Sequence, residues 1–317
     1  MTEFDQLVRA SRLYYELGET QHAIAEQLGV TRPQVSRLLK RARAEGIVEI
    51  RIVDRTAVES PAADALRERF GLVAVHLAPT IAGPEHLTRR MVGRLGAQML
   101  RGVVREGAVV GIGDGASVGA IAEALDDDVT PIDATLVPLT GGYWSPGPER
   151  EPFRRIADAF DAQSRGLMAP GLLDDAATKR ALEAHAGVRT VRDLWDHLDV
   201  ALVGIGGPSW TSAAVGRPIM DRLAEAGAVG EMLIAPFDID GRFVCPELRE
   251  RTLAFDARRL GRVPMSIGVG SGERKVGPIL GALRTGTLRV LITDVATAEA
   301  VVGLDRATPR RRRVTSR

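Results

Sequence analysis

Basic and amide side chains recur along a short segment near the N-terminus, between Thr31 and Ala44. In the major groove of DNA, arginine pairs with guanine and glutamine with adenine, while lysine and hydroxyl groups bind phosphates. This segment contains no acidic residue, although the whole chain carries a net charge of only +1. We therefore expect contacts with double-stranded DNA from the side chains of Thr31, Arg32, Gln34, Ser36, Arg37, Lys40 and Arg41.

A second set of polar residues follows five predicted strands in the rest of the chain. Glycine is combined there with hydroxyl or charged residues, in segments 111–119, 140–145, 204–208, 237–242 and 268–275. Free backbone amides in such loops bind anions, and Asp238 and Lys275 would add a hydroxyl acceptor and a cation. One such loop alone is a weak sign, because strand-to-helix turns use glycine routinely. Together the five loops predict a pocket for a sugar, a polyol or a sugar phosphate.

Other ligand classes fit these loops less well. The glycine spacing of residues 111–119 differs from the dinucleotide fingerprint, and the loop lacks the Gly-Lys-Ser/Thr of a phosphate-binding loop. No histidine lies in the five loops or has metal-ligand spacing with another, so we expect neither a metal nor another cofactor. An enzyme remains the alternative, since Asp238, Glu273, Lys275 and Asp294 could supply acid–base chemistry to an isomerase or deaminase. Asp294 could equally cap the helix that follows it.

The basic segment lies on the second helix of a predicted helix-turn-helix over residues 20–44. Three residues occupy the positions that this motif restricts most. The small side chain of Ala25 lets the two helices approach, Gly29 permits a positive φ in the turn, and Val35 anchors the second helix in the core. The alternating sequence over residues 46–52 predicts a short strand, which would form a wing beside the helices. An ordinary helical hairpin with a solvated charged face is the alternative interpretation.

From Leu72 onward, short apolar strands alternate with amphipathic helices. Because the strands lack a clean polar–apolar alternation, we expect an α/β fold whose mostly parallel sheet is covered on both faces. The predicted strands are residues 73–77, 109–112, 135–139, 201–205, 233–237, 263–268 and 290–292. The predicted helices are residues 87–104, 118–125, 154–163, 179–186, 219–226, 274–284 and 297–302. Ligands bind beyond the carboxyl ends of parallel strands, so the polar loops would meet at one edge of the sheet.

The chain is expected to have four parts: a helix-turn-helix domain (1–54), a linker helix (55–70), an effector domain (71–305) and a disordered basic tail (306–317). Six arginines and no acidic residue follow Asp305, so the preceding residues carry a net charge of −5. The single cysteine, Cys245, fits a reducing compartment. No apolar run is long enough to span a bilayer, and the first residues lack the layout of a signal peptide. These features predict a cytoplasmic protein that makes no contact with membranes.

The sequence resembles the SorC family of bacterial sugar-responsive transcriptional regulators, sometimes grouped with DeoR-type regulators. The resemblance covers nearly the whole chain and is most specific over residues 21–50, 199–208, 227–244 and 270–298. It implies a DNA-binding domain joined to an effector domain similar to glucosamine-6-phosphate deaminase and ribose-5-phosphate isomerase. It also implies a homo-oligomer, a dimer or a tetramer, that changes its operator binding when a carbohydrate effector enters the pocket. The expected function is control of a carbohydrate catabolic operon.

The family's ligand motifs, matched onto this sequence, imply a set of effector-binding residues: Gly113, Asp114, Gly115, Ser117, Gly141, Gly142, Asp238, Glu273 and Lys275. Family members that recognise a phosphate often have hydroxyl residues directly after the double glycine. Here Tyr143 and Trp144 follow it instead. This aromatic pair suits stacking of Tyr143 against an unphosphorylated sugar or a small polyol, although both rings could also be core residues.

Overall fold

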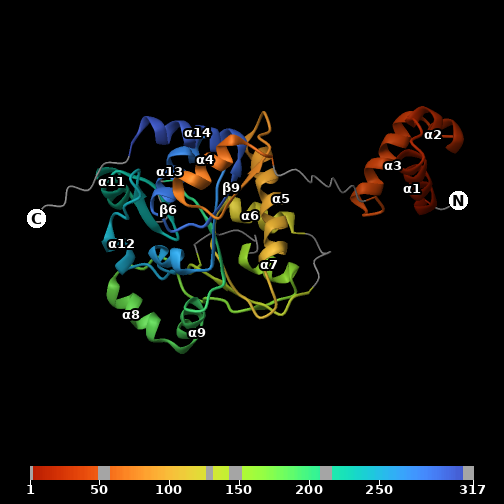
Figure 1. Cartoon of the computed structure of the whole chain (residues 1–317). Coiled ribbons are helices and arrows are strands. Elements are labelled where there is room, and N and C mark those ends of the chain that lie inside the picture. The colour runs from red at the N-terminus through yellow and green to blue at the C-terminus, as the bar shows by residue number, and fades with distance from the viewer. Residues whose placement is uncertain (1–2, 49–57, 126–130, 143–151, 208–215, 310–317) are drawn as a thin grey trace, which may run out of the picture. The chain divides into compact units, whose positions relative to one another are not determined.

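The computed structural model describes residues 3–48, 58–125, 131–142, 152–207 and 216–309. The chain divides into two compact units, Met1–Arg55 and Thr56–Arg317 (Figure 1). The division lies beside the boundary predicted after residue 54. We describe each unit by itself.

The small unit is entirely helical within its described residues. It contains α1 (Glu3–Ser11), a π-helical turn η1 (Arg12–Glu16), α2 (Gln21–Leu28) and α3 (Arg32–Ala44). Gly29 ends α2 with a φ of +65°, a conformation that costs glycine little. Ile24 and Ala25 of α2 pack with Val35 and Leu39 of α3 in one buried cluster. This arrangement confirms the predicted helix-turn-helix. The predicted wing lies mostly outside the described residues, and Ile47 and Val48 form no strand.

The large unit contains a seven-stranded sheet in the order β1-β9-β8-β5-β2-β3-β4. Every neighbouring pair in this sheet runs parallel, which confirms the predicted α/β class. Its strands are β1 (Ala74–Ala78), β2 (Val109–Ile112), β3 (Thr135–Pro138), β4 (Gln163–Ser164), β5 (Val200–Gly204), β8 (Met265–Val269) and β9 (Val290–Asp294).

Alternate residues of each central strand enter two separate cores. On β5, for example, Val200 and Leu202 belong to one buried cluster, whereas Ala201 and Val203 belong to another. The first cluster lies under α5 (Glu85–Val103), α6 (Ala116–Ala124) and α7 (Pro152–Ala159). The second lies under α4 (Pro61–Phe70), α9 (Ala186–Trp195), α13 (Val276–Arg284) and α14 (Val295–Ala307). Burial on both faces explains why the strands read as continuous apolar runs.

One predicted strand, 233–237, does not belong to the sheet. Its residues form the turn and second strand of an antiparallel hairpin, β6 (Ala228–Met232) and β7 (Ala235–Asp238). The loop that follows it is therefore not at the carboxyl edge of the parallel sheet. The sequence did not predict α9, which follows α8 (Ala176–Ala184) directly, or the short helix α12 (Pro246–Glu250). Helix α11 (Arg217–Glu225) confirms the helix predicted at 219–226.

The predicted linker helix and tail need correction as well. Helix α4 packs onto the large unit, where Leu66 is buried and the Arg69 guanidinium lies 2.9 Å from the Asp305 carboxylate on α14. At the other end, α14 continues through Arg306, and the buried Arg284 donates to the carbonyl oxygen of Thr308. Residues 306–309 thus belong to the folded unit, and 310–317 lie outside the described residues. Within the part of the chain that the structure describes, no helix is long and apolar enough to cross a membrane.

Candidate functional site

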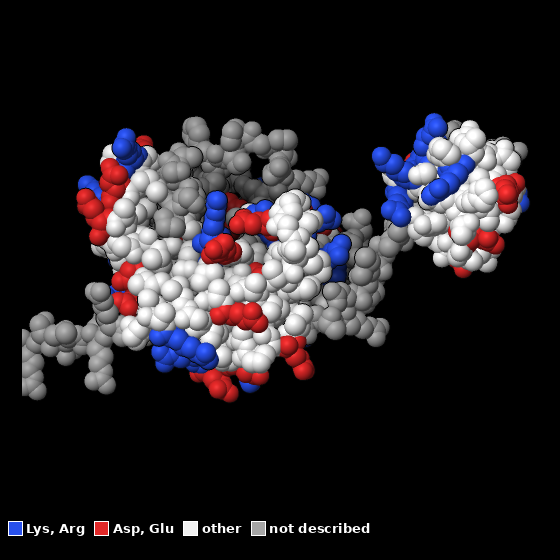
Figure 2. All heavy atoms as spheres, turned by 90° about the horizontal axis from the view of Figure 1, so that it is seen from above, with Lys and Arg blue, Asp and Glu red and all other residues white. Residues whose placement is uncertain are grey.

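The outer face of α3 carries the side chains predicted to contact DNA. Val35, Leu39 and Ala42 are buried, and the seven predicted residues from Thr31 to Arg41 are exposed. Two subsets have a spacing of three or four residues, 32/36/40 and 34/37/41, so these six side chains lie along one broad side of the helix. Figure 2 shows Lys and Arg side chains gathered on one side of the small unit, apart from its Asp and Glu side chains. The exposed side of α3 is therefore predominantly basic.

Some of these side chains already have partners within the small unit. The Gln34 amide oxygen accepts hydrogen bonds from the Thr31 backbone N–H (2.7 Å) and from the Thr31 hydroxyl (2.9 Å). The first of these is the contact that the third helical residue makes with the N-cap residue in a capping box. Arg41 pairs with Glu45 one turn later. Among the described residues, Arg37 and Lys40 make no ion pair, so both are available to an incoming ligand.

A cavity of about 410 Å³ opens at the carboxyl edge of the parallel sheet. We call it the effector cavity, because Asp114, Gly115, Ser117 and Lys275, four of the residues that the family resemblance implies for effector binding, line it. Its lining comes from the loops after β2, β5 and β8, from the start of α5 and from the β6–β7 hairpin. The lining residues are Glu85, Arg89, Asp114, Gly115, Ala116, Ser117, Thr140, Gly204, Ile205, Gly206, Gly207, Glu231, Leu233, Ser271, Arg274 and Lys275.

Two half-buried groups of opposite charge face this cavity. The Lys275 ammonium donates to the carbonyl oxygen of Ile205 (2.7 Å), and burial lowers the pKa of Lys275. Glu231 accepts a hydrogen bond from the backbone N–H of Ile234 (3.0 Å). Burial raises the pKa of Glu231 to about 7, against the opposing effects of that hydrogen bond and of the Lys275 charge. A cation and a carboxyl group that is easily protonated thus lie in the same cavity.

Glycines leave room for the Glu231 side chain and for the loop after β2 at the cavity wall. A Cβ atom at Gly206 would lie 1.9 Å from Oε1 of Glu231, and one at Gly204 would lie 2.7 Å from the carbonyl oxygen of Asp114. Gly115 precedes α6 with a φ of +113°, which is outside the range of other residues. The first turn of α6 therefore presents its free backbone amides at the cavity wall, where they favour an anionic group.

A second and larger cavity, about 1,040 Å³, extends along the carboxyl ends of β2 and β3. It shares Arg89, Asp114, Gly115, Ala116 and Thr140 with the effector cavity, so the two are continuous. Gly113, Gly141 and Gly142 line this part, together with the basic side chains of His86, Arg90 and Arg155.

Comparison with known proteins assigns a family to this arrangement. Residues 56–303 match the Sugar-bind family, a sugar-binding domain, and residues 4–49 match a homeodomain-like helix-turn-helix family. The sorbitol operon regulator of Klebsiella pneumoniae is 30% identical over 93% of this chain and 97% of its own length. The crystal structure of this full-length regulator, SorC, matches with a TM-score of 0.76 over 95% of this chain and 99% of that one. This chain belongs to the SorC family of sugar-binding transcriptional regulators. The deoxyribonucleoside regulator of Bacillus subtilis (strain 168) is also 30% identical, over 93% of this chain and 96% of its own length.

The structure brings together most, but not all, of the residues that the SorC-family motifs imply. Asp114, Gly115, Ser117 and Lys275 line the effector cavity. Gly113, Gly141 and Gly142 line its extension along β2 and β3. Tyr143 lies outside the described residues, as does Trp144.

Asp238 and Glu273 are absent from the lining of both cavities. The Asp238 carboxylate accepts from the backbone N–H groups of Asp240 (3.0 Å) and Arg242 (2.8 Å), so it stabilises the turn after the hairpin. Its strand, β7, belongs to the separate antiparallel hairpin and not to the parallel sheet, so Asp238 does not lie at the carboxyl edge. Glu273 begins a short 3-10 turn, η4 (Glu273–Lys275), and is exposed there.

Three charged residues of the effector cavity lie outside the five predicted loops: Glu85, Arg89 and Glu231. Arg274 lies within the predicted loop 268–275 but was not singled out. Glu231 interrupts the apolar sequence of a strand, and this could have marked it as unusual. Glu85 and Arg89 come from the start of α5, which follows β1. The sequence contains no local signal that this helix contacts loops more than a hundred residues away in the chain.

The structure assigns Asp294, a candidate acid in the enzyme alternative, to helix capping. Its carboxylate accepts from the backbone N–H of Thr297 at the start of α14 and from the Thr80 hydroxyl (2.7 Å). It also accepts from the backbone N–H of Gly272 (3.2 Å). Asp294 therefore helps to hold the loop after β8 in place. Among the described residues, no group of three or more His, Cys, Asp or Glu could hold a metal ion.

Proposed function

We propose that this regulator binds operator DNA through the exposed face of α3 and that a small carbohydrate in the effector cavity changes that binding. The DNA contacts would come from Thr31, Arg32, Gln34, Ser36, Arg37, Lys40 and Arg41. Two recognition helices in a dimer or tetramer would read successive major grooves of a repeated or palindromic site. Control of a carbohydrate catabolic operon and a cytoplasmic location accompany this proposal.

The observation that carries the proposal is the convergence of charged groups of both signs on the effector cavity. Asp114 and Glu231 offer acceptors for sugar hydroxyl groups. Arg89, Arg274 and Lys275 offer cations, and the amides at the start of α6 add to their attraction for an anion. Glu85 also lines the cavity, so its charged residues are three acids and three bases, a set that suits a sugar, a polyol or a sugar phosphate.

Effector binding would alter DNA affinity only through differential contacts with two conformations of the protein. The relatives named above are regulators, and none of them is named as an enzyme. A sugar-phosphate isomerase or deaminase is therefore the weaker hypothesis.

Isothermal titration calorimetry on the full chain tests the cavity. The ligands would be pentoses, tetritols, hexitols and their phosphates, with Lys275→Ala as the variant and Lys179→Ala as the control. Lys179 is a comparably shielded lysine of α8 that pairs with Glu183 away from the effector cavity. We expect one compound class to bind the native chain. Its affinity should be about ten- to a hundredfold lower for Lys275→Ala, because a charge-assisted hydrogen bond is lost, and unchanged for Lys179→Ala. Equal binding by both variants would place the effector elsewhere.

A further inference from the structure

Asp294 makes more contacts than the capping of α14 requires. It is 1% exposed, and its carboxylate accepts from the backbone N–H (3.2 Å) and from the hydroxyl group of Thr297 in the first turn of the helix. Asp175 makes the same two contacts with Thr178 at the start of α8 (2.8 and 3.2 Å). Two contacts are therefore enough for a cap of this kind, and Asp294 has further partners in two other segments of the chain.

The first of these segments is the loop after β8. The backbone N–H of Gly272 lies 2.8 Å from the Thr297 hydroxyl oxygen and 3.2 Å from the Asp294 carboxylate. Gly272 has a φ of +96°, and its carbonyl oxygen accepts from the backbone N–H of Lys275 (2.9 Å). Ser271 and Lys275, on either side of this glycine, line the effector cavity. The Asp294 carboxylate thus holds the residue around which this wall of the cavity turns.

The second segment is the connection between β1 and α5. The Thr80 hydroxyl donates to the Asp294 carboxylate (2.7 Å). The backbone N–H and carbonyl oxygen of the next residue, Ile81, both bond to the Thr88 hydroxyl (2.9 and 3.2 Å). Thr88 lies in the first turn of α5, next to Arg89, which lines the effector cavity. Asp294 therefore connects two walls of the cavity that are distant in the sequence.

We propose that Asp294 is a positioning residue for the effector cavity and sets the effector affinity by holding the loop after β8 against the connection before α5. This inference rests on the proposed function of the cavity. Asp294 does not line the effector cavity, so it acts through Lys275 and Arg89, which do. A site whose side chains are held in place before the ligand arrives binds more tightly, so loss of these hydrogen bonds should weaken effector binding.

Two substitutions break this network with little change in side-chain shape. In Asp294→Asn, the amide NH₂ group must face the backbone N–H of either Thr297 or Gly272, because each carboxylate oxygen accepts from one of them. Thr80→Val removes only the contact with the connection before α5, at an exposed position. Thr80→Ser keeps that hydroxyl group. Asp175→Asn is the matched control, since it alters the same kind of cap on α8.

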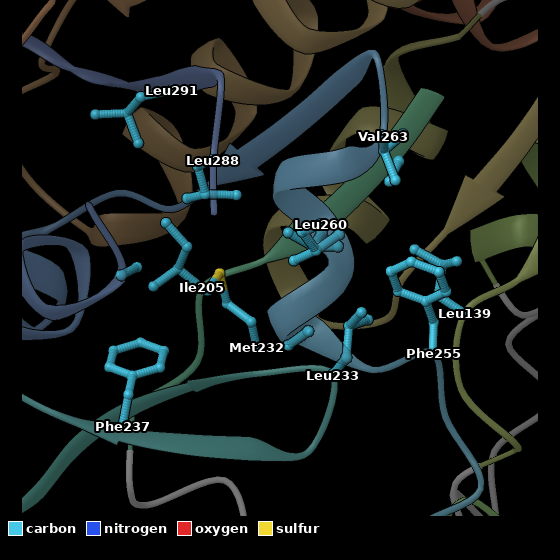
Figure 3. Close-up of a cluster of buried hydrophobic side chains, with 14 of the residues drawn as sticks. Leu139, Ile205, Met232, Leu233, Phe237, Phe255, Leu260, Val263, Leu288 and Leu291 are labelled. Carbon is cyan, nitrogen blue, oxygen red and sulfur yellow. The ribbon is translucent and has the colours of Figure 1, made fainter. Parts of the chain in front are cut away.

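Calorimetry on the full chain, with the sugars, polyols and phosphates named above, measures the effector affinity of each variant. We expect a loss of about tenfold in Asp294→Asn and of about threefold in Thr80→Val, which loses a single hydrogen bond. Thr80→Ser and Asp175→Asn should keep the native affinity. Leu291→Ala separates positioning from stability, because Leu291 is a buried leucine of β9 that does not line the effector cavity (Figure 3). This variant should unfold more easily and bind with native affinity.

A double-mutant cycle tests whether Asp294 acts through Lys275. The loss in Asp294→Asn/Lys275→Ala should be smaller than the product of the two single losses, because the second substitution removes a group that the first has already displaced. Thr80→Val and Thr80→Ser keep the inference testable even when Asp294→Asn folds poorly. Native affinity in the folded Asp294→Asn or Thr80→Val variant, or losses that multiply in the cycle, would overturn the inference while the proposed function stands. Absence of binding by the native chain to every compound would overturn both.

Discussion

Replacing Glu231 by glutamine should remove a pH dependence from the stability of the large unit. Burial raises the pKa of this carboxyl from 4.5 to about 7. Below pH 4.5 the group is protonated in both the folded and the unfolded chain, so its burial does not lower the free energy of unfolding through ionisation. Between pH 4.5 and 7 the unfolded chain loses the proton while the folded chain keeps it, so the free energy of unfolding falls as the pH rises.

The size of the effect follows from the shift. One pKa unit corresponds to about 1.4 kcal/mol, so the native protein should lose about 3 kcal/mol of stability between pH 4.5 and pH 8 through this group alone. Glutamine cannot ionise, and its amide oxygen can still accept from the Ile234 N–H. Glu231→Gln should therefore become more stable relative to the native chain by about 3 kcal/mol over the same range.

Urea unfolding followed by circular dichroism at several pH values between 4.5 and 8 measures this difference. Titrating groups that do not interact with Glu231 contribute equally in both proteins, so their contributions cancel when the curves are subtracted. Lys275 is the exception, because the Glu231 charge raises its pKa and glutamine removes that effect. The expected result is a difference that grows with pH and levels off above pH 7. A difference that does not change with pH would refute the reasoning about the buried carboxyl.

Three further substitutions test other parts of the structure. Arg37→Ala should weaken specific operator binding by about 1–3 kcal/mol, measured by fluorescence anisotropy, and leave effector binding intact; full operator affinity would contradict the assignment of α3. Gly206→Ala should abolish effector binding in calorimetry but preserve operator binding, because the new Cβ would collide with the Glu231 carboxylate; unaltered effector affinity would show that Glu231 is not needed. Arg284→Ala should lower the free energy of unfolding by about 3 kcal/mol in urea titrations, since it removes a buried partner of Asp305; a change below 1 kcal/mol would mean that Arg69 alone neutralises that carboxylate.

Local patterns explain why much of the fold could be predicted from the sequence. The helix-turn-helix is specified by short-range features, among them the buried stripe of Val35 and Leu39 and the positive φ of Gly29. The parallel strands appear as apolar runs because both faces of the sheet are buried. Each of these signals lies within a few residues of the element that it predicts.

The β6–β7 hairpin could not be predicted in this way. Its turn residues are Leu233 and Ile234, where a two-residue hairpin usually has glycine, asparagine or aspartate. Residues 233–237 therefore read as one buried strand, and Asp238 was placed at an edge of the sheet that it does not reach. The conformation is stabilised by tertiary contacts, including the distant Gly206, which the local sequence does not indicate.

The effector cavity shows the same contrast. Residues 114–117 lie in the connection after β2, and Lys275 lies in the connection after β8. Because ligand sites lie at the carboxyl ends of parallel strands, the sequence placed these residues correctly at this edge of the sheet. Arg89 and Glu231 reach it from a helix and from a separate hairpin, and only the tertiary fold brings them there. These residues add the extra cation and the buried carboxyl group that shape the expected effector chemistry.

The most direct test of the account is fluorescence anisotropy of the full chain with DNA duplexes tiled across the region upstream of its own gene. Each duplex would be titrated with and without the sugars, polyols and phosphates used for calorimetry. The account predicts salt-sensitive binding to one duplex, a changed affinity with one compound class, and no such change in Lys275→Ala. Specific binding that no compound alters, or an effector response that persists in Lys275→Ala, would contradict it.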